Sequence, residues 1–300
     1  MYPPFLPTQV HEQCFTYFLF LIKGVIFAVQ NSYTLAQVSK DMSFLDHLEE
    51  LRGHLVRSII AVLVLSIAAF VTTDFWFSKI VLGPSKSDFW TYKTMCWLEQ
   101  RFSISGLCID KLDFVLQSRT MAGQFVMSIT ASLVAGVVLA FPYVFWELWR
   151  FIRPGLYSSE KNVANGLVWY VTILFLIGIS FGYFIVAPLS INFLANYKLD
   201  PTITNQFDVT SYVSTLLMLV LGCGAIFQLP LVILLLAKAG VVSSQFLRLY
   251  RKHAFVVILI TAAFITPSPD ILSQLLLALP MYLLYEFSIL LAIKEERTKA

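Results

Sequence analysis

Long apolar runs are the feature that most limits what this chain can fold into. A helix needs about 20 apolar residues to cross the hydrocarbon core of a bilayer, with a range of roughly 17–25. Runs of this kind lie at 55–73, 125–149, 163–187, 212–237 and 271–293. Only 13% of the 300 residues are charged, whereas a soluble domain carries about 25%. The sequence therefore predicts an all-α polytopic membrane protein.

A sixth apolar run, 253–265, is shorter than a normal span. Only Thr266-Pro-Ser-Pro-Asp270 separates it from the last run. We predict that the two runs form a tight re-entering hairpin, which gives six spans in total. If the short arm crosses, it must thin the bilayer locally or lean on neighbouring helices.

Basic residues gather at alternate ends of the predicted spans. They lie before the first span, between the second and third, between the fourth and fifth, and after the last: Arg52, Arg57, Arg150, Arg153, Lys161, Lys238, Arg248, Arg251, Lys252, Lys294, Arg297 and Lys299. Short cytoplasmic loops of membrane proteins carry an excess of Lys and Arg. We therefore predict that both termini are cytoplasmic and that the long loop 74–120 lies on the opposite side.

Residues 1–41 are an N-terminal extension, and the pattern of apolar runs and basic residues does not assign a structure to it. Cys14–Val29 is apolar but short, and Lys23 interrupts it. The segment fits a seventh span, an interfacial segment or a signal peptide, although its start lacks the positive region of a signal peptide. We expect Met42 to be the natural start, followed by a membrane domain over 42–294 and a cytoplasmic tail over 295–300.

The segment Ser43–Arg52, SFLDHLEELR, combines an apolar stripe with acidic residues just before the first span. Phe44, Leu48 and Leu51 recur at helical spacing, while Glu50 falls on the other side. Such a helix would lie in the membrane interface and hold its carboxylates toward water. The alternative is a solvated face beside a membrane anchor.

A second acidic residue, Glu160, follows an aromatic segment at the end of the second span. Arg153-Pro154-Gly155 ends that helix, and Ser158 or Ser159 starts the next. Glu160 then falls in the first turn, where the helix dipole favours an anion. Stabilisation of the helix would be enough to explain an acid at this position. The alternative is a functional role for Glu160.

Polar residues inside the spans are candidate functional groups. Gln228 sits two residues before Pro230, and the alternative role is ordinary helix–helix hydrogen bonding. The spacing of Gly178 and Gly182 indicates close helix packing. Asp270 opens the last span, where the helix dipole alone would account for it.

Cys96 and Cys108 lie in the long outer loop. A disulfide between them would stabilise the fold by about 3 kcal/mol through the unfolded state, and the alternative is two unpaired thiols. No phosphate-binding loop, HExxH or CxxC pattern occurs in the sequence, so we predict no metal or cofactor. The net charge of +3 is too small to indicate nucleic-acid binding.

Four segments together resemble one family. HLEELR, FWELWRFIRPGLYSSE, FGYFIVAP and TPSPDILSQLLLALPMYLLYE are similar to the TatC family, the multi-spanning subunit of the twin-arginine (Sec-independent) protein translocase. The resemblance covers about 42–293. It implies six helices in a concave, glove-like arrangement with short fifth and sixth helices, in the cytoplasmic (inner) membrane.

The resemblance also implies a function without enzymatic activity. Members bind the Arg-Arg signal peptides of folded precursor proteins. With TatA/TatB-like single-span subunits they export these precursors by the proton-motive force, as homo-oligomers within the receptor complex. The residues at matching positions are Glu50, Arg52, Phe151, Pro154 and Glu160 for the signal peptide, Tyr183, Gln228, Asp270 and Gln274 for partners or intramembrane polar contacts, and Pro84 and Pro188 for structure. Gln228 lies where many members carry glutamate or glutamine, and since it cannot carry a proton, a mechanism that needs an ionisable side chain there does not fit this chain.

Elementary geometry favours two separate acids in such a site. Consecutive side chains of an extended peptide point in opposite directions, so two arginines are best read by carboxylates from two elements, here Glu50 and Glu160. A planar guanidinium bonds a carboxylate in two places, which a lysine cannot do. The rival classes are a secondary transporter or channel for a small solute, and a membrane enzyme. The first should show paired broken segments, and the second should show clustered reactive residues inside the spans.

Overall fold

The computed structural model describes residues 44–102, 108, 114–152, 164–200, 202, 205–238, 240–266 and 271–299. The chain falls into two compact units, Met1–Gly53 and His54–Ala300. The packing given below is that of the second unit. The predicted N-terminal extension lies outside the described residues.

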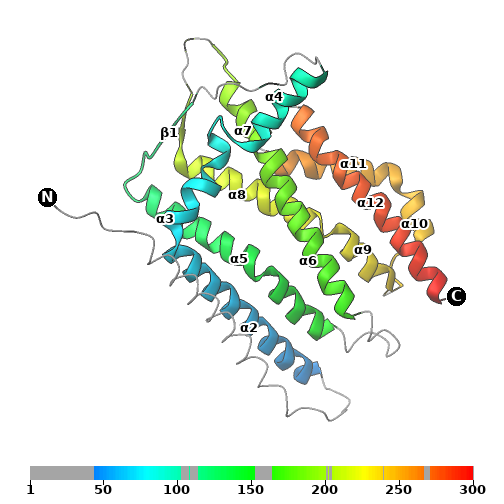
Figure 1. The fold of residues 1–300 in the computed structure, drawn as a ribbon. Helices are drawn as coiled ribbons and strands as arrows, with labels where there is room; N and C mark the ends of the chain where they lie inside the picture. The colour runs from blue at the N-terminus through cyan, green and yellow to red at the C-terminus, as the bar shows by residue number, and fades with distance from the viewer. Residues whose placement is uncertain are drawn as a thin grey trace. The chain divides into compact units, whose positions relative to one another are not determined.

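Helices form almost all of the described structure (Figure 1). The elements in chain order are α2 (Phe44–Val71), α3 (Thr73–Trp76), η2 (Phe77–Val81), η3 (Gly83–Ser85), α4 (Trp90–Phe102), β1 (Val115–Gln117), α5 (Gly123–Ile152), α6 (Ala164–Phe181), η6 (Gly182–Val186), α7 (Ala187–Asn196), β2 (Gln206–Asp208), α8 (Val209–Ile226), α9 (Leu229–Lys238), α10 (Ser244–Leu249), α11 (Arg251–Ile265) and α12 (Ile271–Lys299). Of these, η2 and η6 are π-helical turns and η3 is a 3₁₀ turn.

Five stretches of the described chain are long and apolar enough to cross a membrane. They are Glu49–Val71, Gly123–Ile152, Gly166–Asn196, Val209–Lys238 and Gln274–Lys294. Each overlaps one of the five long runs predicted from the sequence. The sixth run forms α11, whose 15 residues span about 22 Å at 1.5 Å per residue, less than a hydrocarbon core of about 30 Å. The predicted class, an all-α polytopic membrane protein with a short fifth helix, is confirmed.

Two helices differ in detail from the sequence-based expectation. The fourth run is not one helix, because the chain breaks at Phe227 and Gln228 between α8 and α9. Pro230 cannot donate a hydrogen bond to the carbonyl of Ile226, which favours such a break. The last helix is longer than the resemblance implies, since its polar end stays helical as far as Lys299. Its apolar section of 21 residues is nevertheless the shortest of the five.

The core of the second unit lies around α8 and α12. α8 packs against α5, α6 and η6, while α12 packs against α9 and α11. Fully buried members include Val213, Leu219, Leu277, Met281 and Ile289. Of the most apolar 18 residues in the α8–α9 stretch, 44% are buried, against 22% of the corresponding residues in the α2 stretch. α8 is therefore a central helix, while α2 leaves most of its apolar surface to lipid.

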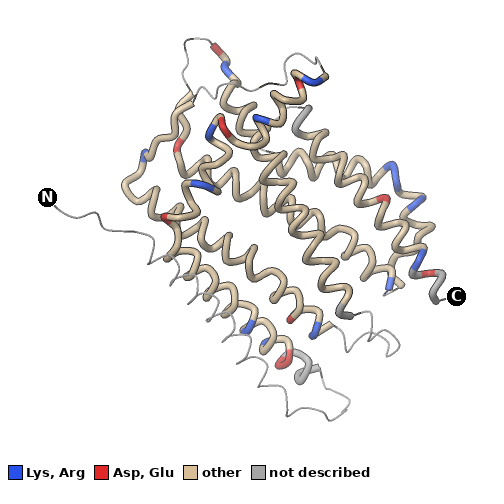
Figure 2. Tube along the Cα trace, viewed as in Figure 1, with Lys and Arg blue, Asp and Glu red and all other residues tan. Residues whose placement is uncertain are grey.

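In the described part of the chain, charged residues lie mostly toward the ends of the helices (Figure 2), and Glu286 near the middle of α12 is an exception. This arrangement is expected because a charge at the bilayer centre is costly. Beyond one end of the helices, β1 and β2 pair as two parallel strands with Leu116 opposite Phe207. The Arg119 guanidinium donates to the carbonyl of Gln206 at 3.0 Å and extends this pairing.

Candidate functional site

A buried polar cluster joins α2 to α5 near the C-terminal end of α5. His54 Nδ1 lies 2.5 Å from Glu147 Oε2, and the Tyr143 hydroxyl donates to Glu147 Oε1 at 2.9 Å. Glu147 has no exposed surface, and the His54 side chain is only 7% exposed. A buried carboxylate is stable only when it is paired and hydrogen-bonded, and both oxygens of Glu147 have such partners.

Local helix geometry explains how these side chains meet. Tyr143, Glu147 and Phe151 recur every four residues on α5, so they share one face of the helix. The Phe151 ring lies 6.2 Å from the His54 ring, centroid to centroid. Phe151 is the sequence-predicted residue that the structure places beside this cluster.

Small residues let α2 and α5 approach closely along the same interface. A Cβ at Gly136 would lie 2.7 Å from the backbone nitrogen of Ser66. The hydroxyls of Thr73 and Ser132 are 3.3 Å apart further along. The two helices are therefore in contact at several levels, and His54 and Glu147 supply the shortest of these contacts.

The predicted structural prolines meet at a second cluster. The buried Tyr92 hydroxyl donates to the carbonyls of Pro84 and Pro188, at 2.9 and 3.2 Å. Burial raises the pKa of Tyr92, so the phenol stays a neutral donor. The Tyr183 hydroxyl donates to the carbonyl of Ile80 at 2.7 Å. Sequence reasoning missed Tyr92, the residue that connects the two prolines.

The π-helical turn η6 contributes Tyr183 and Phe184 to the contacts around this cluster. Pro188 cannot donate to the carbonyl of Phe184 four residues earlier, and the Thr91 hydroxyl of α4 donates to that carbonyl instead. α4 is held in place by this bond and by Tyr92. Both contacts fix the loop that carries α4 against the third membrane stretch.

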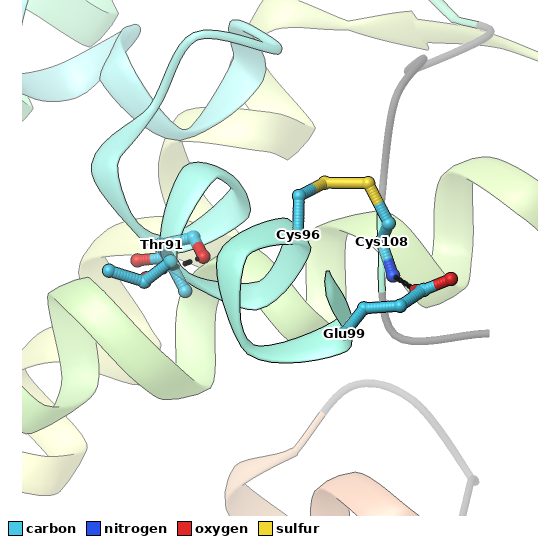
Figure 3. Close-up of a disulfide and its surroundings, with 5 residues drawn as sticks. Thr91, Cys96, Glu99 and Cys108 are labelled. Atoms are coloured by element: carbon cyan, nitrogen blue, oxygen red, sulfur yellow. Dashed lines mark hydrogen bonds between the residues drawn. A yellow bond between two sulfur atoms is a disulfide. The ribbon is translucent and has the colours of Figure 1, made fainter. Parts of the chain in front are cut away.

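Cys96 and Cys108 form a disulfide that closes part of the same loop (Figure 3). It connects α4 to the segment at Cys108, whose backbone N–H donates to the Glu99 carboxylate. The other cysteine of the described residues, Cys223, is a buried free thiol.

Gln228 lies at the break between α8 and α9, beside α6. Its side-chain nitrogen is 3.5 Å from the carbonyl of Val171, and its buried Oε1 has no hydrogen-bond partner among the described residues. Three further buried polar atoms in this region, on Trp149, Tyr170 and Thr172, also lack one there.

The remaining predicted residues are Gln274, two residues of the first compact unit, and three that lie outside the described residues. Gln274 is half-buried and donates to the carbonyl of Leu259 at 3.0 Å, which ties α12 to α11. Glu50 and Arg52 lie on α2 within the first compact unit, Glu50 half-buried and Arg52 exposed. Pro154, Glu160 and Asp270 lie outside the described residues.

His54 and Glu147 were missed by sequence reasoning. The available signal was Glu147 itself, an ionisable residue within a predicted span, which is a functional candidate by default. Within the described ranges, no three His, Cys, Asp or Glu side chains are grouped closely enough to hold a metal ion.

Comparisons with known proteins agree on one family. The family model described as "Sec-independent protein translocase protein (TatC)" matches residues 46–280. A protein of that name from Blattabacterium sp. subsp. Periplaneta americana is 36% identical over 86% of this chain and 98% of its own length. Another from Helicobacter pylori (strain ATCC 700392 / 26695) is 38% identical over 82% of this chain and 85% of its own.

Solved structures give the same answer. A chain described as "Crystal Structure of Twin Arginine Translocase Receptor- TatC" matches with a TM-score of 0.63 and 32% identity, covering 83% of this chain and 99% of that one. A second, described as the same receptor in DDM, matches with a TM-score of 0.63 and 34% identity. By sequence and by fold, this chain belongs to the TatC family of Sec-independent protein translocase proteins.

Proposed function

We propose that this chain binds the Arg-Arg signal peptides of folded precursor proteins at its cytoplasmic face. The observation that carries the proposal is the fold match over 99% of a chain described as a twin-arginine translocase receptor. With TatA/TatB-like single-span subunits and further copies of itself, the chain exports these precursors by the proton-motive force. It works in the cytoplasmic (inner) membrane with both termini in the cytoplasm, in line with the basic residues at alternate span ends.

Glu50 and Glu160 are the proposed ligands of the two arginines. Each would accept a charge-assisted bond worth about 1.5–3 kcal/mol, which corresponds to about ten- to hundredfold in affinity. Arg52, Phe151 and Pro154 shape the surroundings of these acids. The apolar stretch of the signal peptide would enter near Gln228, whose buried carbonyl oxygen lacks a partner in the described part of the chain. Tyr183, Asp270 and Gln274 are proposed for partner subunits.

Photo-crosslinking in membranes tests the proposal. A signal peptide with Arg-Arg and a matched peptide with Lys-Lys are each incubated with the wild-type chain, Glu50→Ala and Glu160→Ala. We expect labelling of the wild type by the Arg-Arg peptide alone, and loss of that labelling in each variant. Equal labelling by both peptides would mean that the apolar stretch alone is recognised, and the two-carboxylate site would be wrong.

A further inference from the structure

His54 and Glu147 form a buried pair, and neither of them is among the residues proposed to bind the signal peptide. Glu147 is completely buried, so a bound peptide cannot contact it without rearrangement of the helices. His54 and Tyr143 occupy its two oxygens. An intramembrane acid with such specific partners calls for an explanation beyond packing, because apolar residues of the same size would fill the space at less cost.

Side chains of both α2 and α5 surround the His54–Glu147 pair. From α2, His54 contacts the carboxylate directly, while Arg57 Nη1 lies 3.9 Å away and its side chain is 45% exposed. From α5, Tyr143 supplies the second hydrogen bond, and Phe151 packs against the His54 ring. The pair therefore fixes both the rotation and the axial position of α2 against α5.

We propose that His54 and Glu147 are a positioning pair that sets the selectivity for Arg-Arg signal peptides. In the chain, Glu50 precedes His54 by one helical turn of α2, and Glu160 follows Glu147 beyond the end of α5. Each partner of the pair thus lies on a helix that is close in sequence to one of the proposed carboxylates. A hydrogen bond depends steeply on distance and angle, whereas apolar contact is non-directional. This inference rests on the proposed function.

Two variants separate positioning from packing. The double variant His54→Leu/Glu147→Leu keeps the interface filled and strands no buried charge, so the protein should still fold. We expect its affinity for the Arg-Arg peptide to fall by about tenfold, equivalent to about 1.4 kcal/mol, toward that for the Lys-Lys peptide. Glu147→Gln should retain most of the selectivity, because an amide can still bond the Tyr143 hydroxyl and a neutral imidazole.

Glu286 offers a matched control on α12. It accepts a hydrogen bond from Tyr282 one turn earlier at 3.1 Å, and one from Arg251 at 2.7 Å. Glu286→Gln removes a comparable membrane-helix charge from a different interface, so it should leave the affinity for both peptides unchanged. Affinities are measured on the purified full chain in nanodiscs, with labelled peptides and fluorescence anisotropy.

The outcomes are distinct from those of the proposed function. If the wild type binds both peptides equally, the Arg-Arg site itself is wrong. If the wild type discriminates and the folded double Leu variant discriminates as well, the pair only fills space and the positioning role is overturned. The positioning role would be supported if the double Leu variant loses its selectivity for the Arg-Arg peptide while Glu147→Gln and Glu286→Gln keep theirs.

Discussion

At the residue scale, the Tyr143 hydroxyl provides a test of how much a single donor to a buried carboxylate contributes. It donates to Glu147, whose carboxylate has no contact with water. Tyr143→Phe leaves one carboxylate oxygen without this donor, and a buried unsatisfied group costs about 1–3 kcal/mol. We expect a loss of this size in the free energy of unfolding, measured by SDS titration in mixed micelles.

Tyr282→Phe is the matched control for that measurement. Tyr282 makes the same one-turn bond to Glu286, but the Glu286 side chain is 31% exposed. The Arg251 guanidinium still donates to the Glu286 carboxylate there, and such a charge-assisted bond is stronger than a neutral one, so this variant should cost less than about 1 kcal/mol. Equal losses in the two variants would show that burial of Glu147 does not determine the effect.

At the element scale, the contact between α6 and α8 depends on a glycine. A Cβ at Gly178 would lie 2.8 Å from both the Cys223 carbonyl oxygen and the Phe227 Cβ. Neither atom can move without its backbone, so Gly178→Ala must push the helices apart. We expect a destabilisation of about 1–3 kcal/mol, typical of overpacking, in the same SDS titration.

Gly166 is the control on the same helix. A Cβ there would meet nothing within 4 Å, and alanine is the better helix former by up to about 1 kcal/mol. Gly166→Ala should therefore leave stability unchanged or raise it. Destabilisation by both substitutions would mean that the close approach at Gly178 is not the cause.

The short helix α10 gives a pH-dependent prediction at the same scale. The backbone N–H of Ser244 donates to Glu296 Oε1 at 2.6 Å, and the Ser244 hydroxyl donates to Oε2. These bonds hold the pKa of Glu296 below its ordinary value of 4.5, with a smaller contribution from Arg248. A carboxyl with a lowered folded-state pKa stabilises at pH values above its unfolded pKa, and this stabilisation is lost as the pH falls through the folded-state pKa.

Hydrogen–deuterium exchange of the α10 amides, corrected for the intrinsic rate, should therefore be slow at pH 7 and increase as the pH falls below the ordinary carboxyl value of 4.5. Glu296→Gln should make exchange in α10 faster at pH 7 and remove this pH dependence. A wild-type α10 that exchanges equally at both pH values would contradict the role of the Glu296 contacts.

At the scale of the whole molecule, the apolar runs predict the helices because run length is a local property of the sequence. The break at Phe227 and Gln228 was less predictable, since Pro230 inside a membrane helix is often tolerated. The three-residue strands β1 and β2 are too short to show periodicity. The His54–Glu147 contact joins residues 93 positions apart, and it depends on how two helices rotate against each other, which no local pattern contains.

Two independent arguments predict the same sidedness for the membrane domain. The basic residues at alternate span ends predict that the loop carrying α4 lies outside the cytoplasm. The Cys96–Cys108 disulfide in the same loop needs an oxidising compartment to persist. In right-side-out vesicles, a membrane-impermeant reductant should therefore open the disulfide, while in inverted vesicles it should remain intact.

Single cysteines test the same topology without the disulfide. In a background of Cys96→Ser/Cys108→Ser, Thr202→Cys should react with an impermeant maleimide in right-side-out vesicles, and Ser243→Cys only in inverted ones. Thr202 lies between α7 and β2, and Ser243 precedes α10, so a single membrane orientation must give opposite results for the two sites. Labelling of both sites from one side would reject the six-span topology, whereas a uniform reversal would keep the topology and overturn the assignment of its sides.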